Sequence, residues 1–492
     1  MNRSSQPVCR HLVTILVLSC LVNPAWPARA LAEDRPNLIL IMADDLGHEA
    51  LGCYGGRSYS TPLLDQLASR GMRFTHCYSQ PVCTPSRVKI MTGQSNARNY
   101  REFGLLPAGQ ITFGHLLKAE GYRTCIAGKW QLSGNANSRS KGMTWEDCGF
   151  DQSCMWAYSH YLSDADRAHW TRHSIFKGRR NTSRFWNPSL LVNGQYQPTT
   201  GNDFGPDLYT QFILDFIQAN RESPFFIYYP MALTHSPFVP TPHSQPLKEE
   251  DKIGSNPKFF GDMIRYTGHL VNRIIKTLGE TGIAEKTLVL VTTDNGTGRG
   301  IRSHLGDRLV LGGKALPIDA GCHVPLIAYW KGTIRPGSLC HDLVEFSDFL
   351  PTLMDTAGGK APAHLPIDGQ SFLPQLLGRP TQPRPHVLVH YDKDPASRKP
   401  KFRRVRFAYD GQYKLYQDGR FFHVPSDWDE ERPRSIQSLN PNELEIRQNL
   451  QAAFSRLPAW NPDNSIFGGR PDDETTKRLA WRDRILGKAP VE

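Results

Sequence analysis

A cysteine followed closely by a proline and an arginine lies within residues 81–93, which read PVCTPSRVKIMTG. Pro85 suits the first turn of a helix, so Cys83 is expected just ahead of that turn. The unpaired N–H groups of a helix start attract anions, and Arg87 would add a fixed positive charge that can fork onto a tetrahedral oxyanion. These residues predict a thiol beside an anion-binding helix start. The alternatives for Cys83 are a buried small hydrophobe or a disulfide partner.

The five residues from Cys83 to Arg87 resemble the C-x-P-S-R signature of the formylglycine-dependent sulfatases. In that family an enzyme oxidises the cysteine to a Cα-formylglycine aldehyde. The resemblance therefore implies that Cys83 becomes formylglycine and that a maturation enzyme is a partner. A motif of five residues recurs by chance, so the family's metal and lysine motifs must follow in the right order.

Acidic residues end two continuous apolar runs. Residues 37–42 (NLILIM) lead into Asp44 and Asp45, and residues 287–293 (TLVLVTT) lead into Asp294 and Asn295. Such runs predict buried strands of a helix-covered sheet, whose carboxyl ends carry the sites of open α/β folds. Adjacent carboxylates would repel each other without a cation between them, although acidic pairs also occur in ordinary turns.

Hard oxygen ligands suit Ca²⁺ in preference to Mg²⁺, and either of these rather than zinc. The D-N-G at 294–296 resembles the family motif that completes the metal site. The resemblance implies that Asp44, Asp45, Asp294 and Asn295 bind the cation together with the hydrated aldehyde at Cys83.

Two lysines occur in settings similar to the sulfate-binding motifs of the family. GKWQL at 128–132 resembles G-K-W-H-L-G, which assigns Lys129 to the sulfate, but Gln131 replaces the histidine that holds the formylglycine. Glutamine can donate and accept hydrogen bonds but cannot carry a proton at neutral pH, so a reduced rate is expected. GGK at 312–314 makes Lys314 the second sulfate-binding lysine.

His235 follows an apolar strand and precedes Ser-Pro, which resembles the family histidine that bonds the ester oxygen. His304, between the second metal motif and Lys314, is a further candidate for substrate binding. Residues 135–205 show little periodicity but many aromatic and basic side chains, which suit a pocket for a sugar sulfate and equally suit ordinary loop packing.

The resemblance implies a two-step hydrolysis. One hydroxyl of the hydrated aldehyde attacks sulfur in line and the alcohol leaves, then the second hydroxyl expels sulfate. Lys129, Lys314 and His235 would hold the sulfate, Arg87 would steady the diol, and His235 or Lys314 would protonate the leaving oxygen.

The fold expected is α/β, with a large mixed, mostly parallel sheet covered by helices, as in the alkaline-phosphatase-like superfamily. Helices are predicted at 61–71, 112–120, 207–218 and 259–278, and further strands at 122–127 and 224–229. A proline-rich stretch, 362–385, is expected to link a catalytic domain at 33–385 to a smaller α+β domain at 386–492. There a β-meander is predicted at 402–409, 412–416 and 420–424, followed by a helix from Asn440.

Residues 1–32 have a basic start, an apolar run and an Ala-Leu-Ala cleavage site, which predict a secretory signal and a secreted or periplasmic protein. The run is too short for a stable membrane span, and lipoprotein attachment at Cys20 is a second alternative. Eight cysteines follow the signal. Modification of Cys83 leaves an odd number, and Cys148 with Cys154 is the local bridge considered.

The chain has 492 residues and a formal net charge of +11, which favours an acidic partner. Neither a zinc-finger spacing nor a compact basic block points to nucleic acid, so we expect none. The favoured function is a sulfatase acting on a sulfated carbohydrate. Two alternatives remain: a phosphodiester or phosphonate monoester hydrolase on the same scaffold, and a glycan-binding pseudoenzyme, which Gln131 motivates.

Overall fold

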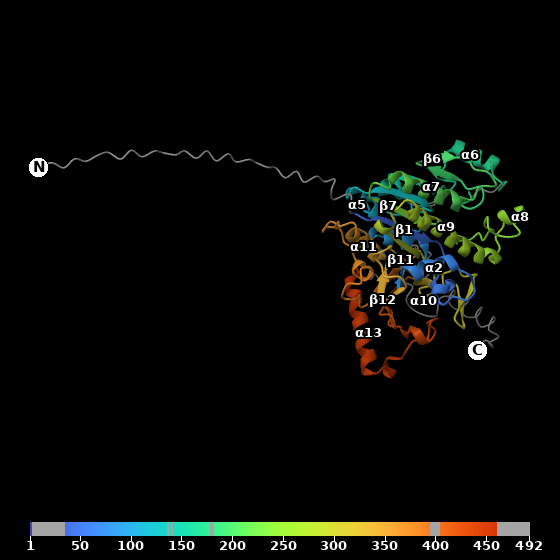
Figure 1. Cartoon of the computed structure of the whole chain (residues 1–492). Helices are drawn as coiled ribbons and strands as arrows, with labels where there is room; N and C mark the ends of the chain where they lie inside the picture. The colour runs from blue at the N-terminus through green and yellow to red at the C-terminus, as the bar shows by residue number, and fades with distance from the viewer. Residues whose placement is uncertain (2–34, 135–137, 139–140, 178–181, 394–403, 460–492) are drawn as a thin grey trace, which may run out of the picture.

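The computed structural model describes Met1 and residues 35–134, 138, 141–177, 182–393 and 404–459. Within them, one large sheet has the strand order β12-β2-β11-β8-β1-β7-β3-β4-β5-β6 (Figure 1). Its central strands run parallel: β8 (Thr287–Thr293), β1 (Asn37–Ala43), β7 (Phe225–Pro230), β3 (Arg123–Gly128) and β4 (Gln152–Trp156). The prediction of a mixed, mostly parallel sheet is confirmed.

The outer strands make the sheet mixed. On one side they are β11 (His323–Tyr329), β2 (Met72–Tyr78) and β12 (Ser338–Glu345), and on the other β5 (Leu190–Val192) and β6 (Gln195–Gln197). Strand β11 runs antiparallel to both β8 and β2, and β5 runs antiparallel to β4. These outer strands were not predicted from the sequence.

Helices cover both faces of the sheet, which is why β1 is apolar at every position from 38 to 43. Alternate residues of β1 enter two separate cores, Leu38, Leu40 and Met42 on one face and Ile39, Ile41 and Ala43 on the other. The first face packs on α3 (Cys83–Thr92), α5 (Phe113–Ala119) and α11 (Phe349–Thr356). The second packs on α2 (Pro62–Arg70), α7 (Gly205–Asn220) and α9 (Phe260–Glu280).

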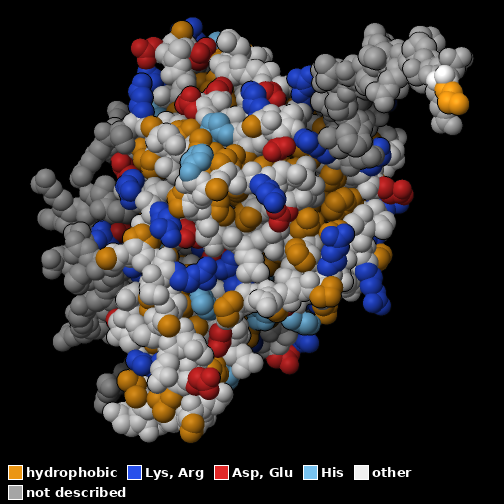
Figure 2. All heavy atoms as spheres, turned by 90° about the vertical axis from the view of Figure 1, so that its left-hand side faces the viewer, with side chains coloured by type: hydrophobic (Ala, Val, Ile, Leu, Met, Phe, Trp, Pro, Cys, Tyr) orange, Lys and Arg blue, Asp and Glu red, His pale blue; other side chains and the backbone are white. Residues whose placement is uncertain are grey.

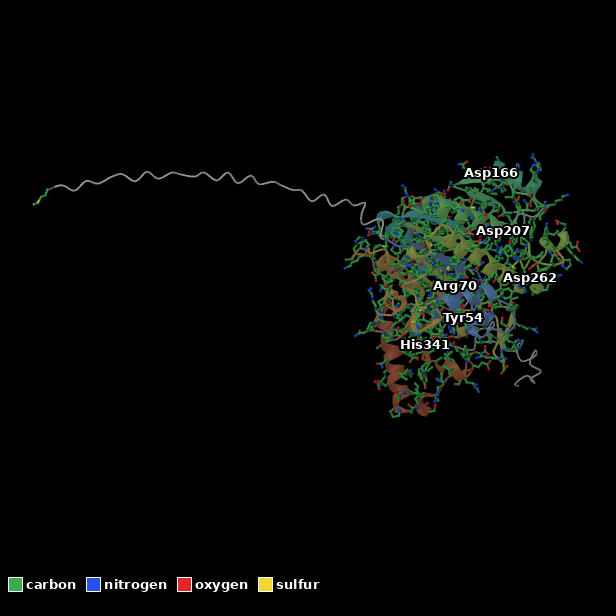
Figure 3. All side chains as sticks on the ribbon, viewed as in Figure 1. Tyr54, Arg70, Asp166, Asp207, Asp262 and His341 are labelled. Atoms are coloured by element: carbon green, nitrogen blue, oxygen red, sulfur yellow. The ribbon has the colours of Figure 1, made fainter. Side chains whose placement is uncertain are left out.

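Helices α7 and α9 are joined by Asp207, which is labelled in Figure 3. Its carboxylate accepts hydrogen bonds from the Tyr266 hydroxyl at 2.7 and 2.8 Å and pairs with Arg273 at 3.2 Å. The other helices of this region are α4 (Asn96–Asn99), α6 (Asp164–His173), α8 (Glu249–Lys252), α10 (Asp319–Cys322) and α12 (Leu373–Leu376). All four helices and both strands predicted from periodicity occur, with ends shifted by one or two residues.

A second, antiparallel sheet follows the proline-rich stretch. Its strands are β13 (Val387–Tyr391), β14 (Val405–Tyr409), β15 (Tyr413–Tyr416) and β16 (Phe421–His423). One face packs on α13 (Pro441–Ala453), whose N-cap Asn440 forms a capping box with Glu443. The other face shares a core with Tyr78, Val82 and Leu343 of the large-sheet region. The predicted meander is confirmed, β13 was missed, and the domain boundary at residue 385 stays a prediction.

The Cys148–Cys154 bridge considered from the sequence does not form. All eight cysteines among the described residues are free thiols. Cys148 packs in the core on one face of the sheet and Cys154 in the core on the other, so the sheet itself separates the two side chains. The predicted signal, with Cys20, lies outside the described residues. In the part of the chain that the structure describes, no helix is both long and apolar enough to cross a membrane.

Basic side chains on the face shown in Figure 2 are dispersed among acidic and apolar ones.

A shorter two-stranded sheet, β9 (Arg302–Leu305) with β10 (Arg308–Leu311), leads into the segment that carries Lys314.

Candidate active site

The two acidic strand ends lie side by side because β1 and β8 are neighbours in parallel register. Ala43 is paired with Thr293, so Asp44 and Asp294 emerge together at the carboxyl edge of the sheet. The backbone N–H of Asp45 donates to Asp294 Oδ1 at 3.1 Å, and Asn295 Nδ2 donates to Asp45 Oδ1 at 2.8 Å. All four side chains are buried.

Helix α3 brings Cys83 and Arg87 to the same edge. The helix begins at Cys83, and each of its residues is buried, so neither side chain can reach bulk solvent freely. Arg87 Nη2 lies 2.8 Å from Asp294 Oδ2 and 3.9 Å from Asp44 Oδ2. The arginine therefore contacts the carboxylates of both strand ends and joins the cysteine helix to them.

The two predicted lysines pair with the first acidic strand end. Lys129 directly follows β3, and its backbone N–H donates to Pro230 at the end of β7. Its Nζ lies 2.6 Å from Asp44 Oδ2, and Lys314 Nζ lies 2.6 Å from Asp45 Oδ2. Three cationic side chains thus surround three carboxylates.

Burial and charge act in opposite directions on these carboxyls. Burial alone would raise the pKa of Asp44, but neighbouring positive groups, Lys129 foremost, hold that pKa well below its usual range. For Asp294, burial first and then the charge of Asp44 raise the pKa to about 7, even though Arg87 pairs with it. Asp294 is therefore the carboxyl of this group whose ionised form its surroundings favour least.

The oxygen atoms at the two strand ends could hold a metal ion. Ligand atoms of Asp44, Asp45 and His235 lie within 4.8 Å of one another. Asp44 Oδ1 and Asn295 Oδ1 are buried and have no hydrogen-bond partner among the described residues, so both are available as ligands. Carboxylate and amide oxygens fit a hard cation such as Ca²⁺.

Gln131 contacts the cysteine. Its Oε1 lies 3.6 Å from Cys83 Sγ, in the place where the sequence motif would put a histidine. The backbone of Gln131 has a φ of 57°, a left-handed conformation that is uncommon for a residue with a side chain. The side chain is thus directed at the cysteine by an unusual backbone turn just after β3.

His235 reaches the site from the segment after β7, with Nε2 3.6 Å from Asp45 Oδ2. Arg184, which the sequence analysis missed, approaches its other ring nitrogen: Arg184 Nη2 donates to His235 Nδ1 at 2.7 Å and also to the Ser236 carbonyl. The same Nδ1 lies 2.6 Å from the Ser236 carbonyl, which can only accept, so this nitrogen faces both a donor and an acceptor. Burial first, and Arg184 as well, lower the pKa of His235 to about 3, so the ring is neutral.

Arg184 could not be singled out from sequence. It lies in the aperiodic, arginine-rich insertion, and no spacing distinguished it from neighbours such as Arg172. Arg184 also lines a cavity of about 550 Å³ next to His235, built largely from that insertion. Two further arginines of the insertion, Arg179 and Arg180, lie outside the described residues.

His304 is not brought into the cluster by any contact that the structure describes. It is exposed on β9, where its ring lies 3.4 Å from the Ser58 hydroxyl. The shape of the β9–β10 hairpin, which sequence proximity to Lys314 does not reveal, directs it to the surface.

A second buried histidine group, His48 with His323 and Asp319, has ligand atoms within 4.8 Å of one another. Both ring nitrogens of His323 are engaged, one with Asp319 Oδ2 at 3.3 Å and the other with the Thr75 carbonyl at 2.8 Å. The rings of His48 and His323 stack with centroids 3.9 Å apart, so their nitrogen lone pairs lie in nearly parallel planes and do not converge. This geometry suits a buried ion pair better than a metal centre.

Known proteins are similar to this chain in sequence and in fold. The sulfatase family model matches residues 36–359. Arylsulfatase A from Bos taurus is 32% identical over 414 residues, which cover 80% of this chain and 76% of that protein.

Solved structures agree in fold. A protein in complex with its substrate D-glucosamine-2-N,6-O-disulfate has a TM-score of 0.66 and 20% identity, covering 86% of this chain and 98% of the other. The phosphonate monoester hydrolase of Agrobacterium radiobacter has a TM-score of 0.62 and 18% identity, covering 86% of this chain and 95% of the other. The match to the family over residues 36–359, which include both acidic strand ends and the cysteine helix, shows that this chain belongs to the sulfatases, the sulfuric ester hydrolases.

Proposed function

We propose that this protein hydrolyses a sulfate ester of a carbohydrate, with Cys83 matured to formylglycine and Ca²⁺ bound between the acidic strand ends. The observation that carries the proposal is the convergence of a cysteine at a helix start, two acidic strand ends and two lysines on one sheet edge. A substrate sulfate is anionic, and Lys129 and Lys314 supply fixed positive charges at this edge to receive it.

Each residue of the site has a proposed role in binding the sulfate or in its hydrolysis. When bound, the cation and the formylglycine would supply charge stabilisation and the nucleophilic oxygen. Lys129 and Lys314 would donate hydrogen bonds to the sulfate oxygens, and Arg87 would hold the carboxylates of both strand ends in place. His235 is neutral, and its Nε2, on the side of Asp45, would form the hydrogen bond to the ester oxygen. Of the two predicted proton donors, Lys314 is then the one that carries an ammonium proton.

Carbohydrate is the proposed substrate class because the adjoining cavity combines aromatic and basic side chains. A neighbour of the same fold was solved with a sulfated glucosamine, which supports this choice. The predicted signal at residues 1–32 would place the enzyme in the periplasm or outside the cell, where polysaccharides are available.

The test is to produce the protein with a formylglycine-generating or sulfatase-maturating enzyme and to examine the Cys83 peptide by mass spectrometry. The aldehyde should be present, and an aryl sulfate and a panel of sulfated sugars should be hydrolysed only when it is. The Cys83→Ala variant should be inactive. Full activity of a preparation whose Cys83 is still a thiol would rule the proposal out.

A phosphonate monoester hydrolase is the second candidate, favoured by a neighbour of that activity with a similar fold. Comparing kcat/KM for an aryl sulfate and an aryl phosphonate ester of the same alcohol separates the two. A preference for the phosphonate ester would replace the sulfatase assignment.

The pseudoenzyme alternative rests on Gln131, which cannot carry a proton where the family motif has histidine. It predicts that the matured protein binds sulfated glycans and hydrolyses none, and that binding survives Cys83→Ala.

A further inference from the structure

The cavity beside His235 contains two buried cations and no acidic side chain among its described lining residues. Arg184 and Lys252 line it together with Trp156, Tyr158, Phe176 and Phe185. Its volume of about 550 Å³ lies within the range of small-molecule sites, and is large enough for a sugar unit.

Arg184 lies between the catalytic cluster and the cavity. One Nη donates to His235, whereas the guanidinium lies over the Trp156 ring, 4.8 Å from its centre. The residue is only 8% exposed, and its buried Nε atom has no hydrogen-bond partner among the described residues. An unpaired donor on a buried cation costs free energy unless a ligand accepts from it.

Lys252 supplies the second charge. Its side chain is 3% exposed, and its ammonium lies 4.3 Å from the centre of the Trp186 ring and 3.3 Å from the Gly201 carbonyl. The only carboxylate paired with it in the described part of the chain is Glu249, at 2.7 Å, whose side chain is 76% exposed and therefore well solvated. Solvent screens the carboxylate of that pair, so Lys252 can still attract an anion in the cavity that it lines.

We propose that this cavity binds a second anionic group of the substrate, a sulfate or a carboxylate, on the sugar whose ester is cleaved or on the adjacent sugar. The inference rests on the proposed function and narrows it to doubly anionic saccharides. Arg184 sets the distance between the second anionic group and the cleaved ester. It lines the cavity and also contacts His235, which we propose to bind the ester oxygen. The aromatic walls would pack against the sugar ring.

The test uses three disaccharides that carry the same cleavable sulfate and differ at one other position, which bears a hydroxyl, a sulfate or a carboxylate. The matured enzyme is expected to show a kcat/KM at least about tenfold higher for one or both doubly anionic sugars, as a charged hydrogen bond would give. Comparison of the sulfate and the carboxylate identifies which group the cavity takes. Equal values for all three sugars would overturn the inference.

Lys252→Met should reduce that preference to near unity, whereas Lys252→Arg should retain most of it. The matched control is Lys276→Met. Lys276 lies on α9, its side chain is 71% exposed, and it is not among the described residues that line the cavity, so this variant should keep the preference of the wild type. If Lys252→Met lowers only the melting temperature and keeps the preference, the lysine is structural and the inference fails.

Binding by the Cys83→Ala protein, measured by calorimetry with the same sugars, separates this inference from the proposed function. Tighter binding of the doubly anionic sugars without hydrolysis by the matured enzyme would leave the cavity assignment standing and reject the sulfatase proposal. Hydrolysis of all three sugars at equal rates, with equal binding, would support the sulfatase proposal and reject the cavity assignment.

Discussion

The ammonium group of Lys129 lies 2.6 Å from Asp44 Oδ2, and both side chains are fully shielded from solvent. The lysine that we propose to bind the substrate sulfate therefore neutralises a carboxylate that we propose as a metal ligand. Lys314 and Asp45 repeat the relationship at the same distance. Substrate binding and cation binding are expected to depend on each other because they use the same four charges.

Lys129→Met should expose this dependence. Without Ca²⁺ the variant loses about 3–5 kcal/mol of stability, since Asp44 remains buried without its main counter-charge. Added Ca²⁺ should raise its melting temperature more than that of the wild type, because the cation replaces the lost charge. Its kcat/KM should nevertheless fall about a hundredfold, as on loss of an anion-stabilising donor. Calorimetric melting with and without Ca²⁺ is the measurement, and an unchanged Ca²⁺-dependent shift would contradict this account.

Asn295 tests the cation site from the other strand end. Adding Ca²⁺ to chelator-treated protein at about 100 times its Kd should stabilise the fold by about 2.7 kcal/mol. Asn295→Leu keeps the size of the side chain but removes the unpartnered Oδ1 and the Nδ2 that donates to Asp45, so its stabilisation by Ca²⁺ should be much smaller. Asp307→Asn, which alters a carboxylate that is 97% exposed, should respond like the wild type. An equal response of Asn295→Leu would exclude this residue as a ligand.

Gln131→His should increase turnover about tenfold. A well-positioned acid–base group contributes about a hundredfold or more, and the variant is expected to gain part of that. The left-handed backbone at this position accepts histidine, which is among the residues enriched there. Gln131→Asn is the control, since asparagine tolerates the same backbone but adds no titratable group. Single-turnover rates of fully matured protein are the measurement. A rate unchanged from that of the wild type would count against the idea that glutamine slows the reaction.

Periodicity and strand chemistry predicted much of the fold and the acidic strand ends. β1 and β8 are apolar at consecutive positions because helices cover both faces, and their parallel pairing places Asp44 beside Asp294. Such patterns involve residues that are adjacent in the chain, so they can be recognised in a single sequence.

Features that depend on tertiary geometry were missed or wrong. The spacing of Cys148 and Cys154 cannot show that a sheet lies between them. Arg184 meets His235 across 51 positions, from a loop without periodicity. His304 is close to Lys314 in sequence, but its hairpin carries it to the surface. No local pattern encodes these relationships.

Lys89 on α3 tests how the cysteine helix is held in place. Its Nζ lies 2.9 Å from Glu345 Oε2, and both side chains are buried; Arg384 contacts the other oxygen at 3.2 Å. Burial alone would raise the pKa of Glu345, but Lys89 and Arg384 lower it to about 2. Because the pKa is lowered on folding, this carboxylate stabilises the protein above its unfolded pKa of about 4.5, and the contribution is lost as the pH falls toward 2.

Lys89→Met should therefore cost about 3 kcal/mol at pH 7, and the difference from the wild type should shrink as the pH falls below about 4.5. Urea unfolding between neutral and acidic pH measures it. Lys118→Met removes a surface pair with Asp151 and should cost less than about 1 kcal/mol at every pH. The double variant Lys89→Met with Glu345→Gln should recover part of the loss, since no unpaired carboxylate remains. A cost for Lys89→Met that does not change with pH would show that lost packing, and not the ion pair, holds α3 against β12.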